Sequence, residues 1–190
     1  MDYDRILIED ILKGDIDSFE KLINKYQRVV YGYLLKMTFS REEAEDITQE
    51  VFIKVYNNLY KYNGSSRLIT WILKIAVNEF KTQYKKRKRA NYTNHEELFK
   101  DIPCDISDLP EVALEMKESG SELMMVLESI SLEQKNALIL RYIQGFSFKE
   151  VGEIMGISTE AAKMRVQRAK ENLVKKNPRF SPRGGFAYEV

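Results

Sequence analysis

Side chains suited to binding a nucleic acid recur along residues 68–89, a stretch without any helix-breaking residue. The polar residues of this stretch lie three or four positions apart, which places them on one face of a helix. This cationic face comprises Thr70, Lys74, Asn78, Lys81, Lys85 and Lys88. Lysines can neutralise phosphates, and the amide of Asn78 can pair with the edge of a base. A charged helix face is often only solvated, however, so other segments must distinguish the two interpretations.

The opposite face of the same stretch is apolar and predicts packing against a core. Its residues at helical spacing are Ile69, Leu73, Ala76, Phe80 and Tyr84. Amphipathic stretches before it supply the helices that position it, over residues 5–13, 18–38 and 41–60. The predicted helix caps are Asp17 or Ser18, then Ser40 in a capping box with Glu43, then Ser66. In the third helix we expect the inward side to be Ala44, Ile47, Val51, Val55 and Leu59.

A second helical group follows residue 121 and contains a predicted helix-turn-helix at residues 148–170. Capping boxes at Ser131/Gln134 and Ser147/Glu150 begin two helices, and Ser158 caps a last one over 159–176. Gly152 suits a close approach of two helix backbones. An ordinary helix–helix corner has similar dimensions, but the exposed cations favour DNA. The polar positions of the last helix are Lys163, Arg165, Gln167 and Arg168.

Charge is distributed in blocks, although the formal net charge of the 190 residues is only +1. Residues 41–50 and 96–122 are acidic, whereas 81–89 and 163–179 are basic. Such blocks indicate separate surfaces for separate partners, one of them a polyanion. The predicted fold is therefore all-α, with two small helical domains joined by a flexible acidic linker and a helix-turn-helix in the second domain.

A second exposed pattern lies on the predicted helix 41–60, opposite its buried side. This polar ridge consists of Asp46, Gln49, Glu50 and Ile53. Such a ridge is most often a solvated face, and its functional alternative is a docking surface for a partner protein. Tyr60 and Tyr62, near the following loop, could stack on an unpaired base.

Catalysis finds little support in the sequence. There is no glycine-rich phosphate loop, no nucleophile–base set and no metal-spaced carboxylate array. The single cysteine, Cys104, and the single histidine, His95, predict neither a disulfide nor a zinc site. We expect no enzymatic activity, no cofactor and no metal. Without a membrane-length apolar run or a signal-peptide pattern, we expect a soluble cytoplasmic protein.

Taken in order, these motifs resemble those of the extracytoplasmic-function (ECF) sigma factors of bacterial RNA polymerase. The resemblance covers residues 15–89 and 118–176. It rests on Gly14-Asp15 followed by Phe19, on residues 46–52, on Thr70-Trp71-Ile72 leading to Asn78, and on residues 132–173. It implies a region-two domain at 1–89, a linker at 90–117, a region-four domain at 118–177 and a tail at 178–190.

The resemblance also implies roles for these surfaces. The polar ridge would bind the clamp helices of the largest subunit of core RNA polymerase, while the second domain would meet the polymerase flap. The minus-ten promoter element would be bound and melted by Tyr62, Asn63, Gly64, Ser65, Ser66, Arg67, Lys74, Asn78, Lys81 and Lys85. The minus-thirty-five element would be bound by Ser158, Thr159, Lys163, Met164, Gln167 and Arg168. The family pattern further implies an anti-sigma partner, most often membrane-anchored.

Two departures limit what the resemblance implies. Asn63 stands where the family often carries arginine, and Met164 and Gln167 are not its commonest recognition residues. The promoter sequence therefore cannot be inferred. The alternative interpretation, a free-standing helix-turn-helix regulator of duplex DNA, leaves residues 15–89 without a role.

Overall fold

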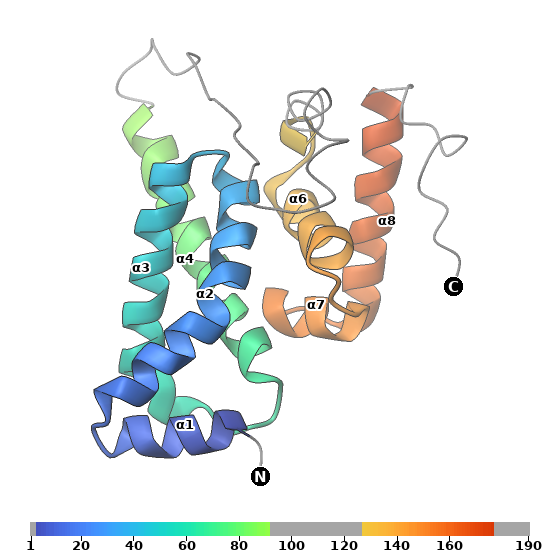
Figure 1. Ribbon diagram of the computed structural model, residues 1–190. Coiled ribbons are helices and arrows are strands. Elements are labelled where there is room, and N and C mark those ends of the chain that lie inside the picture. Colours follow the sequence, from blue (N-terminus) through green and yellow to red (C-terminus); the bar gives the residue numbers. More distant parts are fainter. Residues whose placement is uncertain (1–2, 92–126, 177–190) are drawn as a thin grey trace, which may run out of the picture.

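The computed structural model describes residues 3–91 and 127–176, and within these ranges it contains helices and no strand (Figure 1). The predicted all-α class is confirmed. The predicted linker begins two residues too early, because α4 continues through residues 90–91; the rest of it and the predicted tail, with Cys104 and His95, lie outside the described residues. The elements are α1 Tyr3–Leu12, α2 Ile16–Thr38, α3 Arg41–Asn58, η1 Leu59–Lys61, α4 Leu68–Asn91, α6 Leu132–Leu138, the π-helical η2 Ile139–Ile143, α7 Phe148–Met155 and α8 Thr159–Lys176.

The first unit, residues 3–91, packs α2, α3 and α4 around one apolar core, with α1 against the start of α2. From α2 the core takes Leu22, Val30 and Leu34, which are fully buried. From α3 it takes the predicted inward residues, all of them buried: Ala44, Ile47, Val51, Val55 and, just beyond the helix, Leu59. Burying each Leu, Val or Ile side chain contributes about 1.5–3 kcal/mol relative to exposure. This core is what holds α4 in place.

Helix starts agree with the sequence except at two caps. Asp15 caps α2 in place of Asp17 or Ser18, because its carboxylate accepts hydrogen bonds from Asp17 N (3.0 Å) and Ser18 Oγ (2.7 Å). Both predicted cap residues thus lie inside the first turn as donors. Helix α4 begins after Arg67, whose carbonyl accepts from Trp71 N (3.2 Å), so Ser66 is one residue too early.

The capping boxes are formed to different extents. Ser40 Oγ accepts from Glu43 N (3.3 Å), but the Glu43 carboxylate pairs with Arg87 of α4, so this box is only half formed. The boxes at Ser131/Gln134 and Ser147/Glu150 are complete. A charged side chain of α4 therefore competes with the local cap for Glu43 and ties the start of α3 to the end of α4.

The second unit, residues 127–176, contains the predicted helix-turn-helix as α7 and α8. Gly156 ends α7 in the left-handed conformation (φ 69°), and Ser158 Oγ accepts from Ala161 N (3.1 Å) at the start of α8. Gly152 packs so closely on the turn that a Cβ there would lie 2.8 Å from the Ile157 carbonyl oxygen. The glycine is required by this backbone contact. The inward side of α8 is Ala162, Val166 and Ala169, all buried.

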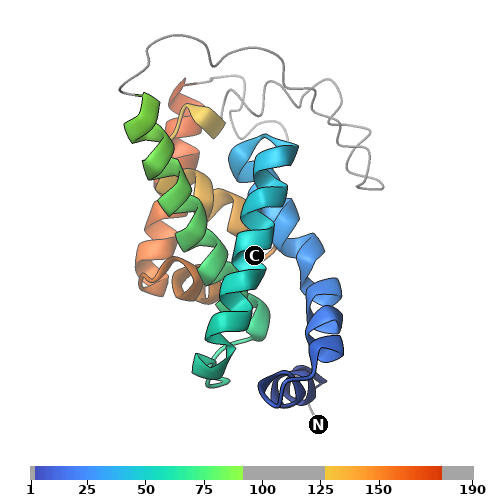
Figure 2. The same ribbon diagram turned by 90° about the vertical axis from the view of Figure 1, so that its left-hand side faces the viewer.

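The two units contact each other, which the sequence did not predict. Helix α7 packs on α4, and η2 lies against α2 (Figures 1 and 2). In Figure 2, α4 (green) runs between α3 (cyan) and the second unit (orange). Two buried hydrogen bonds cross the boundary: Tyr33 Oη donates to Asn136 Oδ1, and Lys135 Nζ donates to the Met37 carbonyl (2.9 Å).

Candidate nucleic-acid interface

The cationic face of α4 is exposed over most of its predicted length. Lys74, Asn78, Lys85 and Lys88 are exposed, and Lys81 is half-buried. Thr70 was placed wrongly, because it is only 2% exposed, and it lines a hollow beside Glu153 of α7. The remaining residues span more than three helical turns, long enough to follow several phosphates of one strand.

The opposite, apolar face is buried as predicted at Ile69, Leu73, Ala76 and Phe80. Tyr84 was expected inward but is 43% exposed, and its ring only lies beside that of Phe80 (centroids 6.0 Å apart). Helix α4 continues beyond the part of the core that covers it, so the helical repeat persists where burial does not. The last turns of α4 therefore present aromatic as well as cationic groups to solvent.

A partly buried ion pair beside Asn78 in the sequence joins α4 to α3. Glu79 is 4% exposed, and its carboxylate accepts hydrogen bonds from Lys54 Nζ and from Gln83 Nε2 (3.0 Å). Burial opposes the charged carboxylate, but these two donors outweigh it and lower the pKa of Glu79. Sequence analysis missed this pair. A usable signal was present, since Glu79 is the only acid among residues 68–89.

The loop before α4 is held by its own polar groups. Tyr62 Oη donates to the Ser66 carbonyl (2.6 Å), and the Tyr62 ring meets Trp71 edge-on at 5.6 Å. Asn63 Oδ1 accepts from Ser65 N (3.0 Å), which stabilises the turn at Gly64 (φ 73°). The loop is thus ordered beside the first turn of α4. Such an arrangement can receive an unstacked base with little further ordering.

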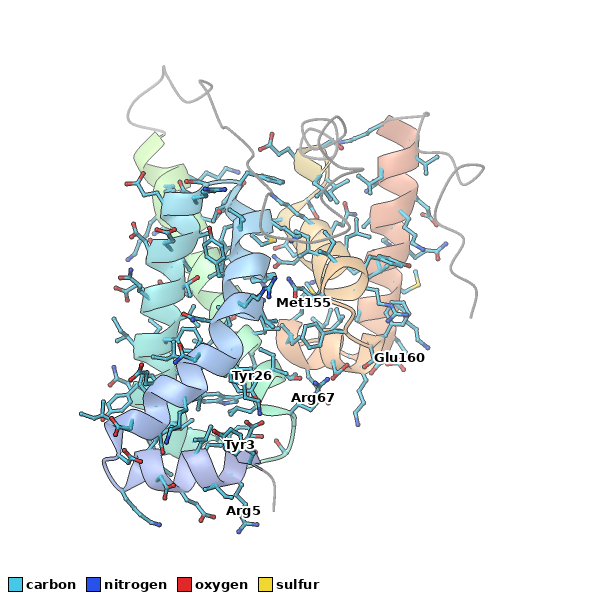
Figure 3. The ribbon with its side chains drawn as sticks, viewed as in Figure 1. Tyr3, Arg5, Tyr26, Arg67, Met155 and Glu160 are labelled. Carbon is cyan, nitrogen blue, oxygen red and sulfur yellow. The ribbon has the colours of Figure 1, made fainter. Side chains whose placement is uncertain are left out.

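Arg67, at the end of this loop, contacts the second unit. Its guanidinium forms an ion pair with Glu150 of α7 (2.9 Å), and Figure 3 shows it reaching from the first unit toward α7. The Ser147 bonds and this guanidinium lower the pKa of Glu150, although its partial burial opposes them. One predicted minus-ten residue therefore has an acidic partner from the other unit.

The polar ridge on α3 is exposed at all four positions, Asp46, Gln49, Glu50 and Ile53. The Ile53 side chain is 54% exposed, and Tyr56 one turn on is 45% exposed. The ridge thus combines carboxylates with uncovered apolar surface.

The predicted minus-thirty-five residues divide into two groups on α8. Lys163, Met164, Gln167 and Arg168 are exposed together and make up the face of α8 that was predicted to recognise DNA, called the recognition face below; Met164 is 52% exposed. Ser158 and Thr159 lie at the start of α8, where with Lys74 of α4 they line a hollow between the two units. Ser158 is also occupied as the cap of α8.

Comparison with known proteins bears on what these surfaces are for. Residues 22–90 match the family of Sigma-70 region 2, and residues 121–173 match Sigma-70 region 4. The chain is 31% identical to RNA polymerase sigma factor YlaC of Bacillus subtilis over 84% of its own length and 91% of that protein. It is 29% identical to the ECF sigma factor SigW of the same organism, over 88% and 93%.

A solved structure has the same fold. The sigma factor RpoE of Bartonella quintana, crystallised with the anti-sigma factor NepR, superposes with a TM-score of 0.65 at 23% identity, covering 84% of this chain and 96% of that one. At this identity the likeness concerns the fold.

The chain belongs to the sigma-70 family of RNA polymerase sigma factors. Within that family it is an ECF sigma factor, an alternative sigma factor that acts in transcription initiation. Sigma factors are initiation factors without a catalytic site of their own. The alternative interpretation, a free-standing helix-turn-helix regulator, does not account for the match of residues 22–90 to region 2. In the described parts of the chain, no helix is long and apolar enough to cross a membrane, and no cluster of potential metal ligands occurs.

Proposed function

We propose that this sigma factor melts the minus-ten promoter element along the cationic face of α4. The observation that carries the proposal is the run of exposed Lys74, Asn78 and Lys85, with half-buried Lys81 between them, on a helix joined to α3 by the ion pair of Glu79 with Lys54. A rigid, water-accessible cationic helix can hold one strand by its phosphates. In this proposal the region-two domain is residues 1–89, the linker 90–117, the region-four domain 118–177 and the tail 178–190.

Strand opening requires a base to be held outside the stack. Unstacking costs a few kcal/mol, which a binding pocket for the flipped base must offset. In the proposal the pocket is the loop 62–67 together with the amide of Asn78, one turn beyond Lys74. The hydrogen bonds of Tyr62 and Asn63 within the loop reduce the entropy that base capture would otherwise cost.

The second DNA contact is assigned to α8. Residues early in a recognition helix reach base edges, while cations farther along contact phosphates. The recognition face, with Ser158 and Thr159 before it, would enter the major groove of the minus-thirty-five element. Two sites on one chain raise the effective concentration of each at the promoter.

The partners follow from the same assignments. The polar ridge of α3 would bind the clamp helices of core polymerase, and the region-four domain its flap. An anti-sigma factor is a further proposed partner, supported by the complex in which the similar RpoE was crystallised.

Membrane anchoring of that partner and a cytoplasmic location remain predictions. We also propose that the chain has no catalytic activity of its own.

Charge reversal in the polar ridge tests the docking role. Asp46→Arg is expected to weaken binding of core polymerase at least about tenfold, because a carboxylate facing a complementary surface becomes a repulsive cation. Gln49→Ala should weaken binding less. Both residues are exposed, so the fold should be unaffected. A pull-down with core polymerase measures the effect.

The matched control is Glu20→Arg, an identical charge reversal at an exposed position of α2. It should bind core polymerase as wild type does. Equal binding by Asp46→Arg and Glu20→Arg would show that the polar ridge does not contact the polymerase. That outcome would not bear on the DNA assignments.

A further inference from the structure

We propose that Gln167 selects a base that presents a hydrogen-bond donor in the major groove, adenine above all, and that Glu171 orients its amide for this contact. Gln167 would thus determine the sequence preference at one base pair of the minus-thirty-five element, and Glu171 would be a positioning residue. The inference rests on the proposed function of α8, because the amide can contact a base only if this helix enters the groove.

Within the recognition face, Gln167 is the side chain able to accept a strong hydrogen bond from a base. Lys163 and Arg168 carry only donors, and the thioether of Met164 is a weak acceptor. Gln167 carries both an amide oxygen and an amide nitrogen. Because the four side chains are exposed together on α8, a base that needs an acceptor opposite it depends on Gln167.

Gln167 lies on the outer side of α8, away from the core. The inward side of the helix is formed by Ala162, Val166 and Ala169, which are at most 2% exposed. Gln167 follows Val166 and is exposed. In Figure 1, α8 forms the outer edge of the second unit, with α6 and α7 on its inner side. The amide is therefore accessible to a duplex that approaches α8 from outside.

A hydrogen bond within α8 determines which atoms of this amide are free. Gln167 Nε2 donates to Glu171 Oε1 (2.9 Å), and the two residues are four positions apart, where side chains on a helix meet. An ionised carboxylate only accepts hydrogen bonds, so the amide nitrogen, and not the oxygen, must face Glu171. The bond uses one of the two N–H groups. The amide oxygen and the second N–H remain available for DNA.

The four bases differ in what they present to such an amide in the major groove. Adenine presents a donor at N6 beside an acceptor at N7, which matches the free oxygen and the free N–H of Gln167. Cytosine presents only the donor at N4, so it can form one of the two bonds. Guanine presents two acceptors, and thymine presents one acceptor and a methyl group, so neither can donate to the amide oxygen. The expected order is adenine, then cytosine, then guanine and thymine.

Glu171 is expected to raise selectivity while lowering affinity. Its carboxylate is exposed on a helix that would approach phosphates, so its charge opposes binding to every sequence alike. Without its bond to Gln167, the amide could turn over and present its nitrogen to the acceptors of guanine. Removal of Glu171 should therefore weaken discrimination at one base pair without weakening binding. A residue that only supported the helix would not have this combined effect.

A change of base preference at a single position tests the role of Gln167. The full-length chain with core polymerase selects promoter duplexes that are randomised only in the minus-thirty-five element, and competition against a fluorescein-labelled duplex then measures each base at each position. Wild type should prefer adenine to guanine roughly 10- to 100-fold at one position, the usual discrimination of a two-bond contact. Gln167→Arg should change that preference to guanine, because arginine donates twice. The inference is overturned if Gln167→Arg changes no position, or if wild type prefers guanine or thymine at the position that changes.

A second variant tests the positioning role. Glu171→Ala should reduce the preference for adenine over guanine at that position about tenfold, because one orientation of the amide no longer dominates, while promoter binding becomes no weaker. Glu133→Ala is the matched control, because it removes a carboxylate from an exposed position of α6, and it should keep the wild-type preference. Circular dichroism checks that each variant remains helical. Wild-type discrimination in Glu171→Ala would show that this residue does not orient the amide.

The same selection separates this inference from the proposed function. If wild type with core polymerase enriches no minus-thirty-five sequence, the assignment of α8 to this element is wrong and the inference falls with it. If wild type enriches a sequence and Gln167→Arg leaves every preference unchanged, α8 still contacts the element and only the base assignment is wrong.

Discussion

Replacing Asn78 by alanine is expected to slow promoter opening by about 10- to 100-fold while leaving polymerase binding unchanged. An amide paired with a base contributes roughly 1–3 kcal/mol of discrimination, and each 1.4 kcal/mol corresponds to a factor of ten. The side chain is exposed on α4, and the neighbouring Glu79 joins the helix to Lys54 of α3. The substitution therefore removes a contact without disturbing the core. Fluorescence of 2-aminopurine placed in the minus-ten element measures the opening rate.

The control for this variant is Asn24→Ala, which removes another exposed amide, from α2. It should open promoters at the wild-type rate. A second comparison, Lys85→Ala, should weaken binding similarly on all sequences and reduce its salt dependence, because phosphate contacts carry no sequence information. If Asn78→Ala opens promoters as fast as Asn24→Ala, base capture does not involve this residue.

Gly152→Ala is expected to lower the free energy of unfolding of the second unit by about 1–3 kcal/mol or more, the usual cost of overpacking. In an ordinary helix the same change would stabilise by up to about 1 kcal/mol, because alanine is the better helix former. The sign reverses here because the new Cβ would lie 2.8 Å from the Ile157 carbonyl oxygen and 3.3 Å from the Ser158 carbonyl carbon. Both neighbours are backbone, so α7 and α8 must move apart. Binding to minus-thirty-five duplex DNA should be lost with that geometry.

The chain provides a matched control in Gly32, which also lies inside a helix. A Cβ at Gly32 would meet only the Gln144 side-chain nitrogen, at an ordinary 3.9 Å. Gly32→Ala should therefore leave the melting temperature unchanged or raise it. Thermal unfolding followed by circular dichroism compares the two variants. Similar melting temperatures for both would show that the close contact at Gly152 does not determine the helix-turn-helix.

The positions of the helices and their buried faces were predictable from sequence because they depend on local patterns. Apolar spacing marked α2, α3 and α8, and hydroxyls or glycines marked several of their ends. Two expectations about helix starts failed for different reasons. Asp15 caps α2 because its carboxylate reaches two donors, and Glu43 is drawn from its capping box to Arg87. A local sequence pattern does not indicate an ion pair between residues that are far apart in the sequence.

The candidate site was predictable only in its local parts. Residue spacing placed Lys74, Asn78 and Lys85 on one exposed face, but it also placed Thr70 there and Tyr84 inside. Both errors depend on what lies beside α4: Glu153 of α7 lies in the same hollow as the buried Thr70, and the core does not extend to Tyr84. The contact of Tyr33 with Asn136 joins residues 103 positions apart, and no periodicity could have indicated it.

Reconstituted run-off transcription tests promoter-specific initiation most directly. Core RNA polymerase is combined with the full-length chain on a library of promoter fragments, with polymerase alone as the reference. We expect transcripts from a small subset of fragments that share two elements at fixed spacing, reduced by Asp46→Arg and by Asn78→Ala but not by Glu20→Arg or Asn24→Ala. The same transcript pattern with and without the chain would contradict its action as a sigma factor.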